Sequence, residues 1–111
     1  MRGARATLDV MRHYRRVGNH THLRSFARAI IEPLAALGSW DAVAIVDAAT
    51  SDQPTFAEGD ERAVEHVRHA RRTLGPTFDP LAARGRSMTD DELVDWLDGV
   101  INDLEADPHP R

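Results

Sequence analysis

Residues 18–40 read GNHTHLRSFARAIIEPLAALGSW, and this stretch decides the fold class. Between Gly18 and Gly38 the apolar residues recur at spacings of three and four, the period of one helical face. They are Leu23, Phe26, Ala27, Ile30, Ile31, Leu34 and Leu37. The stretch predicts a helix that ends at Gly38, because glycine readily adopts the left-handed conformation found after helix ends. Pro33 lacks an amide hydrogen, so we expect a kink or break near residues 29–33.

Helical spacing continues on both sides of this stretch. Val10, Met11, Tyr14 and Val17 precede Gly18, and further striped segments follow up to Leu104. The polar stretch 50–60 predicts a loop. Thr89 and Glu92 have the spacing of a capping box, which starts the last helix. The sequence therefore predicts an all-α protein of about six helices in antiparallel hairpins, since short loops force consecutive helices to pack antiparallel.

Length and composition restrict the class of protein further. A chain of 111 residues, 41% of them hydrophobic, fits one domain, which we place at 1–105, followed by a disordered tail at 106–111. The absence of cysteine excludes disulfides, thiolate metal sites and a cysteine nucleophile. No apolar run approaches the ~20 residues that cross a bilayer, and no signal peptide opens the sequence. We expect a cytoplasmic protein without a membrane partner.

The net charge of −4 hides an asymmetry between the two ends. Residues 1–28 contain seven arginines against Asp9 alone, whereas residues 88–107 contain eight acidic residues and no arginine. Such asymmetry can mark a partner surface. Alternatively the two ends lie close together and neutralise each other, which is the interpretation we favour. The candidate interaction residues are Arg12, Arg15, Arg16, Arg24, Arg28, Trp40, Asp91, Asp95 and Asp98.

From about residue 12 to residue 101 the chain resembles the C-terminal, tetratricopeptide-like region of large actinobacterial regulators. Those proteins couple an ATPase module, often with a LuxR-type DNA-binding or cyclase domain, to an array of helical hairpins. The residues that match are Tyr14, Gly18-Asn19, Thr21, Leu37-Gly38, Ala48-Ala49, Leu74-Gly75, Phe78, Gly85-Arg86, Thr89 and Glu92. The resemblance implies a tetratricopeptide-like helical bundle or short solenoid.

Two residues depart from the pattern of these arrays. Pro33 stands where an aliphatic residue is usual, and Asp47 where a small residue is usual. The 111 residues of the sequence also contain no phosphate-binding loop of the form GxxxxGK[ST]. The resemblance therefore implies neither nucleotide chemistry nor DNA binding for this chain.

Two pairs of histidines are candidates for chemistry. His66 and His69 lie three apart on a predicted helix, so they could share a metal ion with Glu61 or Glu65. Nearby arginines oppose a divalent cation, and we therefore assign no metal site. His20 and His22 lie at the start of a helix, where the dipole disfavours a charged imidazole, and no nucleophile completes a catalytic set. We assign no catalytic residue and no cofactor.

The arginine-rich N-terminal hairpin leaves a DNA-binding alternative open. Its second helix could read base edges with exposed polar residues near its start, namely Thr21, His22, Arg24, Ser25 and Arg28. The overall acidity of the protein argues against this alternative, and we do not expect nucleic acid as the partner.

The sequence-based hypothesis is a non-enzymatic helical interaction module. Helical repeats bury their apolar faces by stacking on neighbours, so a short set of hairpins leaves an apolar end exposed. The expected partner is another protein, the upstream repeats of a parent protein, or a second copy in a homodimer.

Overall fold

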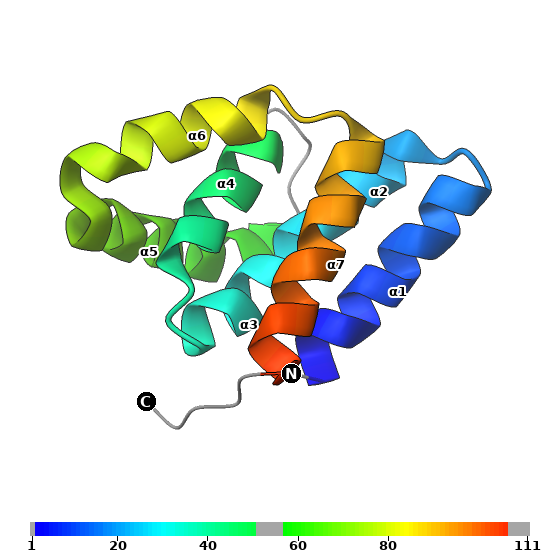
Figure 1. Ribbon diagram of the computed structural model, residues 1–111, viewed down its shortest axis with the longest axis horizontal. Helices are drawn as coiled ribbons and strands as arrows, with labels where there is room; N and C mark the ends of the chain where they lie inside the picture. Colours follow the sequence, from blue (N-terminus) through cyan, green and yellow to red (C-terminus); the bar gives the residue numbers. More distant parts are fainter. Residues whose placement is uncertain (1, 51–56, 107–111) are drawn as a thin grey trace.

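The structure is a computed structural model that describes residues 2–50 and 57–106, and every regular element in that part of the chain is helical (Figure 1). The predicted all-α class is confirmed. The elements, in chain order, are α1 (Arg2–Arg16), α2 (His20–Ala27), the 3-10 helix η1 (Arg28–Ile30), α3 (Ile31–Ala36), α4 (Trp40–Thr50), α5 (Ala57–Leu74), the 3-10 helix η2 (Gly75–Thr77), α6 (Phe78–Arg86) and α7 (Asp90–Ala106). None of the described helices is long and apolar enough to cross a bilayer.

The described elements form five continuous helical runs, so the predicted count of about six is wrong. α2, η1 and α3 follow one another without a gap, and so do α5, η2 and α6. The second of these junctions contains Gly75 and Pro76. Gly75 and Pro76 do not stop the helical chain there, because they belong to a 3-10 turn that leads directly into α6. The body has extents of 37 × 30 × 27 Å, which is less elongated than a solenoid of many repeats.

Two of the sharp turns form at the glycines from which helix ends were predicted. Gly18 has a φ of 76° and Gly38 a φ of 72°, both in the left-handed region. At Gly18 the amide of Asn19 donates to the Tyr14 carbonyl at 2.8 Å, and the amide of Gly18 donates to Arg15 at 3.2 Å. This pair of bonds satisfies carbonyls that the end of a helix leaves unpaired.

Pro33 coincides with the expected break in the second predicted helix. The 3-10 turn η1 separates α2 from α3, and α3 begins at Ile31. Pro33 is therefore the third residue of a new helix, where the amide that proline lacks has no partner within the helix. Ile30, Ile31 and Leu34 are buried on both sides of this break, so the apolar stripe continues from η1 into α3.

The predicted loop at 50–60 is too long at its C-terminal side. α5 already begins at Ala57, and residues 51–56 lie outside the described chain. The first turn of α5 consists of short and acidic residues, which give no apolar periodicity to recognise. Acidic residues at that position are nonetheless favoured by the helix dipole. At the other end of the chain α7 extends through Ala106, and the remainder of the predicted tail, 107–111, also lies outside the described residues.

The last helix begins as its sequence predicts. The amide of Thr89 donates to Glu92 Oε1 at 2.9 Å, and the amide of Glu92 donates to Thr89 Oγ1 at 3.2 Å. These reciprocal bonds are a capping box. The expected start of α7 is confirmed at the residues that define it.

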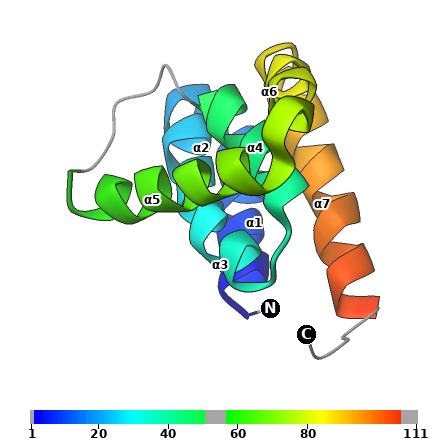
Figure 2. The same ribbon diagram turned by 90° about the vertical axis from the view of Figure 1, so that its left-hand side faces the viewer.

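α4 forms the centre of the core. It packs most closely against α6 and α5, with α3 also in contact (Figures 1 and 2). Its spacing predicted one apolar face, formed by Val43, Val46 and Ala49. The structure instead buries eight of its eleven residues, including Ala44, Ile45 and Thr50. Because most of α4 is in contact with other helices, its apolar residues are not confined to a single stripe.

Candidate interaction surface

The basic N-terminal helix and the acidic C-terminal helix lie side by side (Figure 1). Arg5 donates to Asp98 at 3.4 Å and to Asn102 at 2.7 Å, and Arg12 also pairs with Asp98. Arg15 lies 3.1 Å from Asp95 and 3.9 Å from Asp91. We call these contacts the α1–α7 seam. Much of the charge asymmetry in the sequence is thus neutralised within the chain, which is the interpretation favoured from sequence.

Arg24 connects three parts of the chain that lie far apart in sequence. Its Nε pairs with Asp90 at the start of α7. Its Nη1 donates to the carbonyl of Ala49 at 2.6 Å, and its Nη2 donates to the carbonyl of Met88 at 2.8 Å. The planar guanidinium can hold three acceptors in fixed directions at once. Arg24 therefore clamps α2 to the end of α4 and to the turn before α7.

Arg28, the first residue of η1, makes a second internal connection to α4. Its Nη1 lies 2.9 Å from Asp47 and 3.3 Å from the hydroxyl of Thr50, and its side chain is 14% exposed. Thr50 in turn donates to the carbonyl of Val46 at 2.8 Å. Asp47 is thus the acceptor for an arginine of η1. Sequence spacing gave no signal for this pair, because the two residues meet only through the packing of η1 on α4.

These contacts bear on the DNA-binding alternative. Arg24 and Arg28 would be its basic base-reading residues, yet both are engaged within the protein. The side chains of Thr21, His22 and Ser25, like that of His20, lie outside what the structure describes. The described part of the hairpin therefore presents no set of base-reading side chains.

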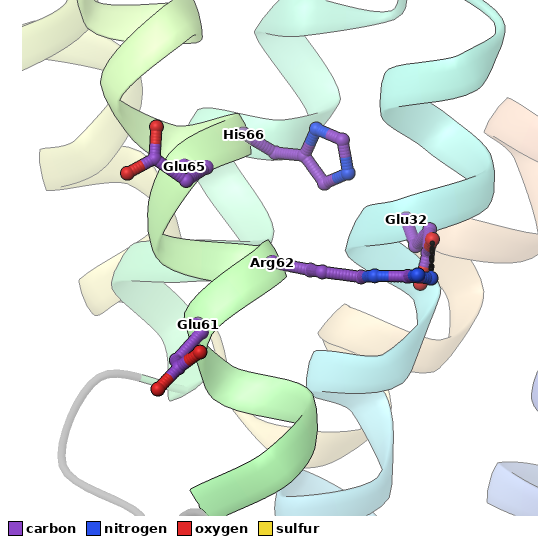
Figure 3. A pocket seen from close by; sticks show the side chains of 5 residues that line it. All are labelled: Glu32, Glu61, Arg62, Glu65 and His66. Atoms are coloured by element: carbon purple, nitrogen blue, oxygen red, sulfur yellow. Dashed lines mark hydrogen bonds and ion pairs between the residues drawn. The ribbon is translucent and has the colours of Figure 1, made fainter.

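The aromatic and histidine candidates are distributed over α4 and α5. Trp40 is half-buried, and its ring lies 4.3 Å from that of His69, centroid to centroid, with 36° between the planes. His66 lies in a shallow hollow of about 370 Å³ between α3 and α5. In Figure 3, Arg62 reaches across this hollow to Glu32, with Nη1 and Oε1 2.9 Å apart, while Glu61 and Glu65 point the other way. Among the described residues, no group of three or more histidines and carboxylates is arranged to hold a metal ion.

The hairpin of α1 and α2 carries the large apolar side chains that are exposed among the described residues. Val17 is 59% exposed and Phe26 37% exposed, and the ring of Phe26 packs edge-on against Tyr14 at 6.1 Å. Val10 and Tyr14 precede Val17 at helical spacing and are half-buried, and His13 beside them is exposed. We call Val10, His13, Tyr14, Val17 and Phe26 the outer hairpin face. Val17 and Phe26 belong to the apolar stripes identified in the sequence, and their exposure could not be predicted from spacing alone.

Comparison of the chain with protein-family models, with curated proteins and with solved structures finds no match.

Proposed function

We propose that this chain is a non-enzymatic helical module that binds another protein through the outer hairpin face. The observation that supports this proposal is the exposure of Val17, three residues after Tyr14 in the chain, and of Phe26, whose ring packs edge-on against Tyr14. Exposed large apolar side chains that cluster, rather than lie scattered, are typical of protein contact sites. Removal of such side chains from water favours association through the hydrophobic effect.

Most of the arginines that were candidate interaction residues in the sequence do not bind the partner in this proposal. Arg12 and Arg15 pair with aspartates of α7, and Arg24 and Arg28 are engaged inside the protein. Arg16 is exposed, and the structure shows no ion pair between it and another described residue. We therefore assign the partner's anchoring to the apolar side chains and its orientation to Arg16 and His13 at their edge.

We also propose, on the resemblance stated above, that the hairpins belong to a tetratricopeptide-like array of a signalling regulator. The tight turn at Gly18, which folds α2 back against α1, supports this view. In such an array the preceding repeats would cover the outer hairpin face.

The experiment is photo-crosslinking in cells that produce the protein naturally. A photoreactive phenylalanine analogue at Phe26 is expected to yield a covalent adduct with a protein partner, because the site is exposed and apolar. The matched control places the same analogue at Ala83, which is exposed on α6 away from the hairpin. Equal adducts from both positions, or none from Phe26, would contradict the proposal. Val17→Glu should abolish the adduct at Phe26 while leaving the free energy of unfolding almost unchanged.

A further inference from the structure

One line of side chains runs along the outward side of α1, at alternating spacings of four and three residues. Its members are Ala6, Val10, His13 and Val17. Ala6 and His13 are exposed, Val10 is half-buried and Val17 is 59% exposed. This alternation is the spacing at which one helix packs lengthwise along another. We call these four residues the α1 stripe.

The opposite side of α1 is occupied within the molecule. Leu8 is fully buried, and Arg12 and Arg15 pair with aspartates of α7. α2 packs against a third side, where Phe26 contacts Tyr14, and α1 forms the right-hand edge of the molecule in Figure 1. The α1 stripe is therefore the side of this helix that a partner can reach.

Two opposite charges lie on one edge of the α1 stripe. Asp9 and Arg16 each directly precede a residue of the stripe, so both lie on the same edge of it. They are seven residues apart, which is two helical turns and about 10.5 Å along the axis. The Asp9 side chain is 61% exposed, and Arg12, which lies 3.4 Å from it, also pairs with Asp98. Arg16 is exposed, and the structure shows no ion pair between it and another described residue.

The α1 stripe matches a copy of itself when the two helices run antiparallel. A two-fold axis through the midpoint of the stripe, between positions 11 and 12, sets Ala6 opposite Val17 of the second copy. The same axis sets Val10 opposite His13 of the second copy. The small residue at one end thus faces the highly exposed side chain at the other end, and the axis repeats this contact.

The charges on the edge favour the same arrangement. An antiparallel pair about this axis brings the same edge of both helices together, and the midpoint of Asp9 and Arg16 lies one residue from that of the stripe. Asp9 of each copy therefore comes opposite Arg16 of the other, and two attractions form at once. A parallel pair would bring unlike edges together and set the charges against Thr7 and Tyr14, which have none.

We propose that this chain forms a closed dimer in which the α1 stripe and Phe26 pack against the same residues of a second copy about a two-fold axis. This inference rests on the proposed function, because it names the occupant of the outer hairpin face. α2 lies on the Tyr14 side of α1, away from Asp9 and Arg16, so the two α2 helices come together on that other side. The dimer therefore covers Val17 and Phe26, both of the large apolar side chains that are exposed in the described chain.

Reversal of the two charges tests the pairing. Asp9→Arg alone and Arg16→Asp alone each set like charges opposite each other twice, so each should weaken association about tenfold at low salt. The double variant Asp9→Arg, Arg16→Asp restores opposite signs and should associate within about threefold of the wild-type chain. Arg72→Asp, at an exposed site on α5, is the control for a change of charge. Sedimentation velocity over a range of concentrations measures association, and circular dichroism checks that each variant is folded.

Single cysteines test the antiparallel register, because the sequence contains none of its own. In the proposed dimer, two copies of position 6, or two copies of position 17, lie about 16 Å apart along the axis, too far for a disulfide. Ala6→Cys and Val17→Cys should therefore not link to themselves under mild oxidation, whereas a mixture of the two should form a linked 1:1 dimer. A mixture of Ala83→Cys with Val17→Cys is the control, because Ala83 is exposed on α6 away from the hairpin.

Any of four results would overturn the inference: a wild-type chain that stays monomeric, one that grows beyond a dimer, a double variant that associates as weakly as the single ones, or self-linking of Ala6→Cys. The proposed function fails separately. An adduct from Phe26 to a different protein, together with a monomeric wild-type chain, would retain the outer hairpin face as a binding surface and exclude the second copy as its occupant. A monomeric chain that yields no adduct would contradict both.

Discussion

Two helix contacts in this protein are held together by opposite means. Where α6 crosses α4, Gly85 lies so close to α4 that a Cβ built on it would be 2.2 Å from the carbonyl oxygen of Ile45 and 3.2 Å from the Cβ of Ala48. Where α1 meets α7, arginines and carboxylates form the contact, with side chains about one-third exposed or more. The first contact is determined by shape and the second by charge.

The difference determines how each contact tolerates change. At a close crossing of small residues, any added atom forces the two helix backbones apart, because the packed interior has no free volume to accommodate it. Exposed ion pairs can exchange partners and are screened by salt, so each contributes little. We therefore expect the stability of the fold to depend on the α4–α6 crossing, and the docking of α1 on α7 to be adjustable.

The largest effect is expected from Gly85→Ala. The added methyl group would meet a backbone carbonyl that cannot rotate away, so α6 must move off α4. Overpacking of this kind costs about 3 kcal/mol of unfolding free energy, at the upper end of the usual range. Chemical denaturation followed by circular dichroism measures this loss, which should not depend on salt concentration.

Gly99→Ala is the matched control for Gly85→Ala. Gly99 lies in the interior of α7 and has open space around it, so the substitution adds helix propensity without a clash. It should stabilise the protein by about 0.5–1 kcal/mol. Equal effects of the two substitutions would show that the α4–α6 crossing is looser than its geometry indicates.

An intermediate effect is expected from Arg24→Met. The substitution keeps the apolar stem but leaves the carbonyls of Ala49 and Met88 and the carboxylate of Asp90 without their common donor. Loss of hydrogen bonds to a partly buried charged group costs about 2 kcal/mol. Arg24→Lys should recover less than half of this loss, because a single ammonium group cannot donate in three fixed directions. Full recovery by lysine would show that Arg24 acts through its charge alone.

The sequence predicted local features well because single residues decide them. Gly18 and Gly38 end helices through left-handed backbone, Thr89 and Glu92 begin α7, and Pro33 marks the break near η1. Each of these features depends on residues within about five positions along the chain. Local chemistry of this kind is visible without knowledge of the fold.

Tertiary arrangement was less accessible to sequence reasoning. The spacing of α4 did not indicate that eight of its eleven residues are buried. Nothing in the sequence indicated that Arg24 reaches carbonyls of two other parts of the chain. The asymmetry of charge indicated that the chain ends could meet, but not which arginine meets which aspartate. Likewise, Val17 and Phe26 belong to apolar stripes, and only the packing of the hairpin leaves them exposed.

A smaller effect is expected at the α1–α7 seam. Asp98 accepts hydrogen bonds from both Arg5 and Arg12, and its side chain is 36% exposed. Asp98→Asn should lower the unfolding free energy by about 0.5 kcal/mol at low salt. The difference should disappear near about 1 M salt, where the Debye length falls to roughly 3 Å. A loss that persisted at high salt would show that the seam is held by shape, like the α4–α6 crossing.

The smallest effect concerns the start of α7, where charge and hydrogen bonding can be separated. The backbone amide of Thr89, and then its hydroxyl, lower the pKa of Glu92 by stabilising the ionised carboxylate. A carboxyl group with a lower pKa in the folded state stabilises the protein above its unfolded pKa, and this stabilisation is lost as the pH falls through the folded pKa. Glu92→Gln retains an acceptor for the amide of Thr89 but has no charge to titrate. Denaturation midpoints of the wild-type chain and Glu92→Gln should therefore differ slightly near neutral pH and converge as the pH falls through the lowered pKa of Glu92. Parallel curves over the whole range would show that the carboxylate acts only as a hydrogen-bond acceptor, and that the N-terminal end of α7, unlike the α1–α7 seam, does not depend on charge.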